Sequence, residues 1–230
     1  KISILARLAF GVDVPVEKIF REGIRRTASQ DFRYAEELGY TIKLLAAARR
    51  EDGGLLVRVH PALVPSDVPM AKVEGVLNVV EAEGDLVGPL WLQGRGAGAE
   101  PTASAVMGDV LRTVSVLRGG GHVPQARPID PDLPLLEMAN HECKYYIRLT
   151  VRDRPGVLAQ IAGALGDMEI SIASVLQVDS DPARGNTDLV IMTHPALEAN
   201  MQRAVERIDS LGDVDTVANL IRVESYPSDR

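Results

Sequence analysis

The 230-residue sequence is poor in cysteine, histidine and aromatic residues. Its one cysteine, Cys143, excludes an internal disulfide and a cysteine-rich metal site. A single cysteine is also typical of a reducing compartment, so we expect a cytoplasmic protein. The histidines lack a ligand spacing such as HxxxH, so we expect no metal site and interpret all four as ordinary surface or loop residues: His60, His122, His141 and His194.

The sequence also lacks long apolar runs and an excess of positive charge. No run approaches the roughly 20 apolar residues that a membrane span needs, and no signal peptide is visible. The net charge of −7 makes nucleic acid an unfavourable partner, because phosphate contacts need a basic face. We interpret two short basic clusters, Arg25–Arg26 and Arg49–Arg50, as solvated helix faces. A hydrophobic content of 46% with 25% charged residues is typical of a globular chain with a core.

Sequence motifs of several enzyme classes are missing as well. A dinucleotide-binding unit begins with a strand, a GxGxxG turn and a helix, and nothing of this kind lies within residues 1–93. The GRGAGA stretch at residues 94–99 follows a predicted strand, but its spacing differs and no βαβ unit surrounds it. No GxSxG is present and Cys143 has no nearby partner pattern, which argues against a hydrolase or a thiol enzyme.

The patterns that are present indicate an α+β fold, with a mixed sheet and helices on one face in the first part of the chain. Apolar spacing predicts a helix over residues 1–10 that ends at Gly11, and a second over 29–38 with Ser29 as its N-cap. The other elements expected before residue 118 are a short helix at 14–24, strands at 40–50 and 55–64, two strands within 73–93 joined by a turn at 83–85, and a helix at 103–117 with Thr102 as its N-cap.

The character of the sequence changes after residue 118. Residues 119–143 are rich in glycine and proline and are interpreted as a linker, whose acidic residues Asp130, Asp132 and Glu137 are solvated loop charges. From Lys144 the order strand, helix, strand, strand, helix, strand predicts a ferredoxin-like βαββαβ unit.

The stretch YIRLTVRDRPGVLAQIAGALGDMEISIASVLQ resembles an ACT domain, a small domain that senses amino acids and tends to pair sheet to sheet. The resemblance implies an effector site in the turn after the first strand. Backbone N–H groups of Gly156, Val157 and Leu158 at a helix N-terminus would hold a carboxylate, and Asp153 would meet an ammonium group. The alternative is that Asp153 only caps the helix and Gly156 only allows the turn.

Four segments before residue 110 resemble homoserine dehydrogenase, in that family's order: KISILARLAFG, DFRYAEELGYTIKLL, VEGVLNVVEAEGDLVG and GRGAGAEPTASAVMGD. The resemblance implies that NAD or NADP serves the interconversion of L-homoserine and L-aspartate 4-semialdehyde in threonine and methionine biosynthesis. It also implies feedback regulation by L-threonine through the ACT domain. The alternative is a non-catalytic module for amino-acid sensing or dimerisation.

The same resemblance assigns site residues. Lys1 occupies the position of the family's acid/base lysine, and a lysine suits this role because its ammonium group polarises a carbonyl and donates a proton. Without the resemblance, Lys1 is interpreted as a frayed, solvated end. Gly98 is the expected cofactor contact, with Gly96 and Thr102 nearby, because a side chain would block close approach. The alternative for these three is a glycine-rich turn before a helix.

The resemblance also divides the chain. Residues 1–93 belong to the substrate-binding and dimerisation part of the catalytic domain, 94–118 return to the nucleotide-binding domain, 119–143 are the linker and 144–230 are the ACT domain. The nucleotide-binding half, a second lysine and the carboxylates that hold homoserine would lie upstream of Lys1. We therefore expect the isolated chain to be inactive, and the choice between NAD and NADP stays open. A homodimer is expected, with a tetramer if the ACT domains pair again.

Overall fold

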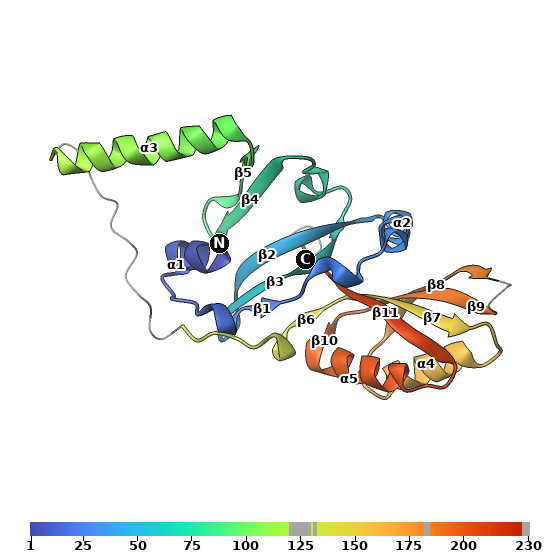
Figure 1. The fold of residues 1–230 in the computed structure, drawn as a ribbon. Helices are drawn as coiled ribbons and strands as arrows, with labels where there is room; N and C mark the ends of the chain where they lie inside the picture. The colour runs from blue at the N-terminus through green and yellow to red at the C-terminus, as the bar shows by residue number, and fades with distance from the viewer. Residues whose placement is uncertain (120–129, 131–132, 182–184, 227–230) are drawn as a thin grey trace. The chain divides into compact units, whose positions relative to one another are not determined.

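The computed structural model describes residues 1–119, 130, 133–181 and 185–226 (Figure 1). Residues 120–129 and 131–132 of the predicted linker, among them His122 and Asp132, lie outside the described residues. The chain divides into two compact units. The first unit unites residues 1–66 with 127–230, and the second comprises residues 67–126.

The first unit is built on one mixed sheet to which both ends of the chain contribute. In the described residues its strand order is β1-β3-β11-β7-β9-β8, and β2 pairs with β3. The link between the two ends is a parallel pairing of β11 with β3, in which Arg222 lies opposite Ala62. The strands are β1 (Phe20–Arg21), β2 (Tyr40–Glu51), β3 (Gly54–Pro65), β7 (Tyr145–Arg152), β8 (Ile172–Asp181), β9 (Asn186–Thr193) and β11 (Val214–Val223).

The C-terminal part of this sheet carries two helices on one face, α4 (Val157–Gly166) and α5 (Glu198–Asp209) (Figure 1). Alternate side chains of β7, such as Ile147 and Leu149, are fully buried against them. Burial of this kind is the main source of stability in such a sandwich, at about 25 cal/mol per Å² of apolar surface. A two-residue strand, β10 (Ala196–Leu197), pairs with β6 (Glu142–Cys143) beside it. The predicted βαββαβ order is confirmed.

The N-terminal segment supplies two further helices. The helix α1 (Ile2–Phe10) buries Ala6 against Leu55 and Val57 of β3. The helix α2 (Ser29–Glu37) packs Tyr34 and Ala35 in one cluster with Leu63 of the same strand. Because these three β3 residues are odd-numbered, they share one face of the strand. The predicted fold class, α+β with a mixed sheet, is therefore confirmed.

The buried clusters also show that α2 covers the face of the C-terminal strands opposite α4 and α5. Its cluster contains Tyr146 of β7, Val190 of β9 and Ile221 of β11, whereas Ile147 of β7 belongs to the cluster under α4 and α5. The sheet of the βαββαβ unit is thus buried on both faces. Residues 1–66 cover the face of this sheet that α4 and α5 leave open.

Several local predictions were wrong. Residues 14–24 form no continuous helix, because Phe20 and Arg21 pair with β3 as β1 between two short 3₁₀ turns, η1 (Val16–Lys18) and η2 (Ile24–Arg26). The helix α2 begins at Ser29, but its N-cap is Ala28, whose amide donates to the Asp31 carboxylate at 2.8 Å. Arg49 and Arg50 lie in β2, and not on a helix.

The second unit contains a hairpin and a helix. The strands β4 (Leu77–Gly84) and β5 (Gly88–Arg95) pair antiparallel, after a 3₁₀ turn η3 (Pro69–Lys72). The helix α3 (Ala99–Leu117) starts four residues earlier than the sequence predicts, with Gly98 as N-cap in place of Thr102. None of its residues is buried.

Candidate functional site

Lys1 is exposed at the beginning of α1. Its carbonyl oxygen accepts hydrogen bonds from the amides of Ile4 at 3.0 Å and Leu5 at 3.1 Å, so the residue is joined to the first turn of the helix. The helix ends at Gly11, whose φ of 73° is the left-handed conformation that glycine adopts most readily. Since Ala6 anchors the helix to the sheet, Lys1 stands exposed at the end of a fixed element.

The three residues predicted near the cofactor lie together in the second unit. Gly98 has φ 123° and ψ 157°, a conformation open essentially to glycine alone. The Thr102 hydroxyl donates to the Gly98 carbonyl at 2.7 Å, which fixes it inside the first turn of α3. A Cβ on Gly96 would overlap the side-chain amide of Asn78, so the glycine leaves room for that side chain. The backbone of this loop is exposed and free of side-chain bulk.

The predicted effector site surrounds the turn between β7 and α4. Gly156 is the N-cap of α4 with φ 93°, and no side chain caps the helix, so Asp153 does not act as a cap. Asp153 is exposed, and its amide donates to the Gly185 carbonyl at 3.0 Å. Val157 is buried, and its amide contacts the Arg154 carbonyl at a long 3.4 Å. Leu158 is 45% exposed, so the turn offers an open helix N-terminus with an acidic residue close in sequence.

These predicted residues are not all brought together. Lys1 and the turn before α4 both belong to the first unit, but they flank different strands of the sheet (Figure 1). Gly96, Gly98 and Thr102 belong to the second unit.

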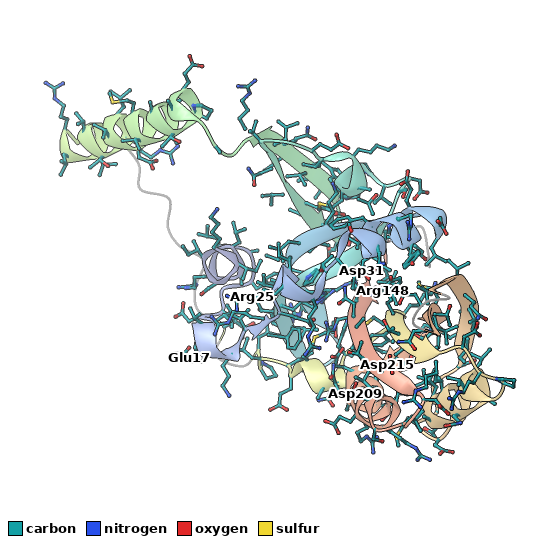
Figure 2. All side chains as sticks on the ribbon, turned by 45° about the vertical axis from the view of Figure 1, so that its right-hand side comes forward. Glu17, Arg25, Asp31, Arg148, Asp209 and Asp215 are labelled. Atoms are coloured by element: carbon teal, nitrogen blue, oxygen red, sulfur yellow. The ribbon has the colours of Figure 1, made fainter. Side chains whose placement is uncertain are left out.

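A buried polar cluster that the sequence analysis missed centres on Asp31 of α2 (Figure 2). Its carboxylate accepts hydrogen bonds from the Arg148 guanidinium at 2.7 and 3.1 Å, from the Tyr146 hydroxyl at 2.9 Å and from the Asn219 amide at 2.9 Å. Burial alone would raise the pKa of Asp31, but the hydrogen bonds from Arg148, the Ala28 amide and Asn219 outweigh it, and the pKa is lowered. The cluster fastens α2 to β7 and β11.

A second buried cluster joins β11, α5 and the segment after β1. The Arg222 guanidinium binds both carboxylate oxygens of Glu198, and its third nitrogen donates to Glu22 at 2.7 Å. Glu198 also accepts from the Tyr145 hydroxyl at 2.9 Å and from the Gln202 amide at 2.7 Å. Burial would raise the pKa of Glu198, yet its bonds to Arg222 lower it. The positive charge of Arg222 and the negative charge of Glu198 therefore compensate each other in the interior.

The prediction that all four histidines are surface or loop residues was wrong for His60, which is buried in a strand, whereas His141 does lie in a loop, directly before β6. His60 is 2% exposed in β3, where its ring packs edge-on against Phe20 at 6.1 Å between centroids. Burial lowers the pKa of His60 to about 4. His141 is also buried, and its Nδ1 lies 3.2 Å from Glu51. Among the described residues, no group of three possible metal ligands gathers.

Cys143 is buried in β6, and burial raises the pKa of its thiol to about 12. The thiol is therefore protonated at neutral pH and is a poor nucleophile. This agrees with the absence of a thiol-enzyme pattern in the sequence.

Two family models match the chain. Residues 1–111 match homoserine dehydrogenase, and residues 145–213 match the ACT domain. The homoserine dehydrogenase of Pseudomonas aeruginosa is 39% identical over 97% of this chain and 53% of its own length. That of Helicobacter pylori is 37% identical over 98% of this chain and 52% of its own length.

Solved structures agree with these matches. The crystal structure of a homoserine dehydrogenase from Thiobacillus denitrificans has a TM-score of 0.86 at 40% identity, over 98% of this chain and 52% of that one. Homoserine dehydrogenase from S. aureus, at a TM-score of 0.65 and 24% identity over 98% of this chain and 52% of that one, shares the fold.

The βαββαβ unit is thus an ACT domain. The chain as a whole belongs to the homoserine dehydrogenase family. It spans about half the length of the curated relatives it matches, which is consistent with a C-terminal portion of such an enzyme. In the part of the chain that the structure describes, none of the helices has the length and apolarity required to cross a membrane.

Proposed function

We propose that the chain is part of an NAD(P)-dependent homoserine dehydrogenase of threonine and methionine biosynthesis. It would interconvert L-homoserine and L-aspartate 4-semialdehyde in the cytoplasm. The observation that carries this proposal is the match of residues 1–111 to the family, together with a 40% identical crystal structure that covers 98% of the chain.

Lys1 has the acid/base role in this proposal. A protonated lysine polarises the aldehyde oxygen of the semialdehyde and donates a proton to it when the carbonyl is reduced. In the opposite direction the neutral amine accepts the proton of the homoserine hydroxyl. Its exposed position at the first turn of α1 supports the role, because the side chain has room to reach a substrate while the helix holds its backbone.

The loop at Gly96 and Gly98 would lie along the cofactor, with Thr102 in the adjacent turn. The loop fits this role, because Gly98 occupies a backbone conformation that side chains rarely adopt and presents no Cβ. NAD or NADP would supply or accept the hydride when bound. We infer that the nucleotide-binding half must be added before the chain can turn over, since the chain spans only 53% of its Pseudomonas aeruginosa relative.

Feedback regulation is assigned to the ACT domain. Leu158 and Gly156 stand at the open N-terminus of α4, which suits a carboxylate, and exposed Asp153 suits an ammonium group. We propose L-threonine as the effector. Exposed apolar side chains on the β4–β5 hairpin, such as Leu90 at 49% and Leu92 at 69%, support a homodimer through this hairpin, and a homotetramer would follow if ACT domains also pair.

The test is absorbance at 340 nm with the product of the intact gene, L-homoserine, and NADP or NAD, with and without millimolar L-threonine. Homoserine-dependent reduction that threonine suppresses supports both the activity and the regulation. The 230-residue chain alone should give no signal in the same assay. Absence of activity from the intact product, with threonine still bound, would favour a non-catalytic sensing module.

A further inference from the structure

A groove of about 940 Å³ lies on the first unit, between residues 20–26 and the helix α5. One wall comes from the N-terminal segment, and the other from α5 and β11 of the ACT domain. Its residues are different from those of the predicted effector turn between β7 and α4. The volume is within the range of small-molecule sites, about 300–1,000 Å³.

The groove is positively charged. Arg21, Arg25 and Arg26 line it, all three are exposed, and in the described part of the chain none of them forms an ion pair or a side-chain hydrogen bond. Its two acidic residues, Glu22 and Glu198, are both already bound by Arg222. Among the described residues that line the groove, the exposed charges without a partner are therefore three guanidinium groups, in a protein whose net charge is −7.

The inner surface of the groove is largely apolar. Phe20, Val205, Val217 and Leu220 line it, and Leu220 is 9% exposed. The buried Arg222 guanidinium lies 4.8 Å from the centroid of the Phe20 ring, so its charge packs against an aromatic face. A ligand that fits both features has an anionic group for the arginines and an apolar body for the walls.

We propose that this groove binds a small organic anion, a carboxylate or a phosphate ester with an apolar body. Guanidinium groups bind both kinds of anion through paired hydrogen bonds. A nucleic acid is an unfavourable ligand for this groove, because the chain has a net charge of −7. A bound anion would clamp residues 20–26 against α5, and so join the N-terminal segment to the ACT domain. This proposal does not depend on the enzyme activity proposed above.

The test is titration of the ¹⁵N-labelled 230-residue chain with phenyl phosphate, phenylacetate and inorganic phosphate, followed by amide chemical shifts. The variant is Arg25→Gln/Arg26→Gln, and the matched control is Arg49→Gln/Arg50→Gln, which removes the same charge from β2. We expect saturable shifts at residues 20–26 and 198–205, with either aromatic anion binding more tightly than inorganic phosphate. The first double variant should weaken binding about tenfold or more, and the control should leave it unchanged.

The two aromatic probes also separate the possible ligand sources. Tighter binding of phenyl phosphate indicates a phosphate ester, and tighter binding of phenylacetate indicates a carboxylate. The proposal is overturned if no saturable shifts occur at the groove, or if both double variants weaken binding equally, because the effect would then follow net charge alone.

Discussion

Asp31 is a single carboxylate on which the attachment of α2 depends, since it binds Tyr146, Arg148 and Asn219 of two strands. Asp31→Ala leaves the Arg148 charge buried without its partner, and such a loss costs about 3–5 kcal/mol. We expect the free energy of unfolding, measured by urea titration, to fall by this amount.

The matched variant for that measurement is Asp31→Leu/Arg148→Met, which removes both charges and keeps the volume apolar. This double variant should be clearly more stable than Asp31→Ala, because no buried charge is left unpaired. Equal losses in the two variants would mean that shape, and not charge compensation, makes Asp31 necessary.

His60 makes stability depend on pH. Its pKa is lowered by burial from 6.5 to about 4, so the unfolded chain takes up a proton at a higher pH than the folded chain. The stabilising contribution is complete above pH 6.5 and is lost as the pH falls toward 4. The melting temperature should decrease over this window, and His60→Gln should flatten the decrease. The lowered pKa of Asp31 also makes the folded chain less stable as the pH falls, but only at more acidic pH than His60 does.

Lys1→Ala tests the proposed acid/base group in the product of the intact gene. Loss of a general acid or base lowers kcat by about 10²–10⁴-fold. The control is Lys18→Ala, which removes another lysine of the N-terminal segment, in η1. It should keep kcat within about twofold. A Lys1→Ala enzyme with normal kcat at 340 nm would remove Lys1 from the mechanism.

At the scale of the elements, two glycines should respond in opposite directions to alanine. A Cβ on Gly54 of β3 would overlap the Pro134 carbonyl oxygen, so Gly54→Ala should destabilise by about 1–3 kcal/mol. A Cβ on Gly163 of α4 meets nothing within 4 Å, so Gly163→Ala should stabilise by about 0.5–1 kcal/mol. Thermal unfolding of both variants checks this, and the contact would be unimportant if Gly54→Ala were neutral.

The long, strongly patterned elements could be predicted from the sequence, because their burial follows a local period. The βαββαβ order and the strands β2 and β3 are of this kind. The region at 14–24 could not, because Phe20 and Arg21 are held by pairing with the distant strand β3. The start of α3 was predicted wrongly because its N-cap is a glycine, Gly98, and not a residue with a polar side chain.

The residues of the candidate site also divide into those that the sequence could suggest and those that it could not. The Lys1, Gly98 and Asp153 assignments come from the family resemblance and stay predictions. The buried charges Arg148 and Arg222 carried a usable signal, since each interrupts an apolar strand, but their partners Asp31 and Glu198 lie far away in the sequence. No local pattern connects such pairs.

At the scale of the whole molecule, the continuous sheet predicts that residues 1–66 and the ACT domain unfold as one cooperative body. In native-state hydrogen exchange, β3, β7 and β11 should open with a common free energy, whereas β4 and β5 of the second unit should exchange with a different one. Earlier exchange of β3 than of β7 would show that the ACT domain stands on its own.

The hydrogen bond between Asp31 and Asn219 has a consequence for biosynthesis, because its partners are 188 residues apart. At about 5–20 residues per second, the ribosome needs roughly 10–40 s to synthesise that distance. During this time the nascent helix α2 has only nearby residues such as Ile42 and Leu63 to cover its apolar face, and Asp31 lacks its partners from β7 and β11. The N-terminal third of the chain is thus a natural client for a holding chaperone until its last strand leaves the exit tunnel.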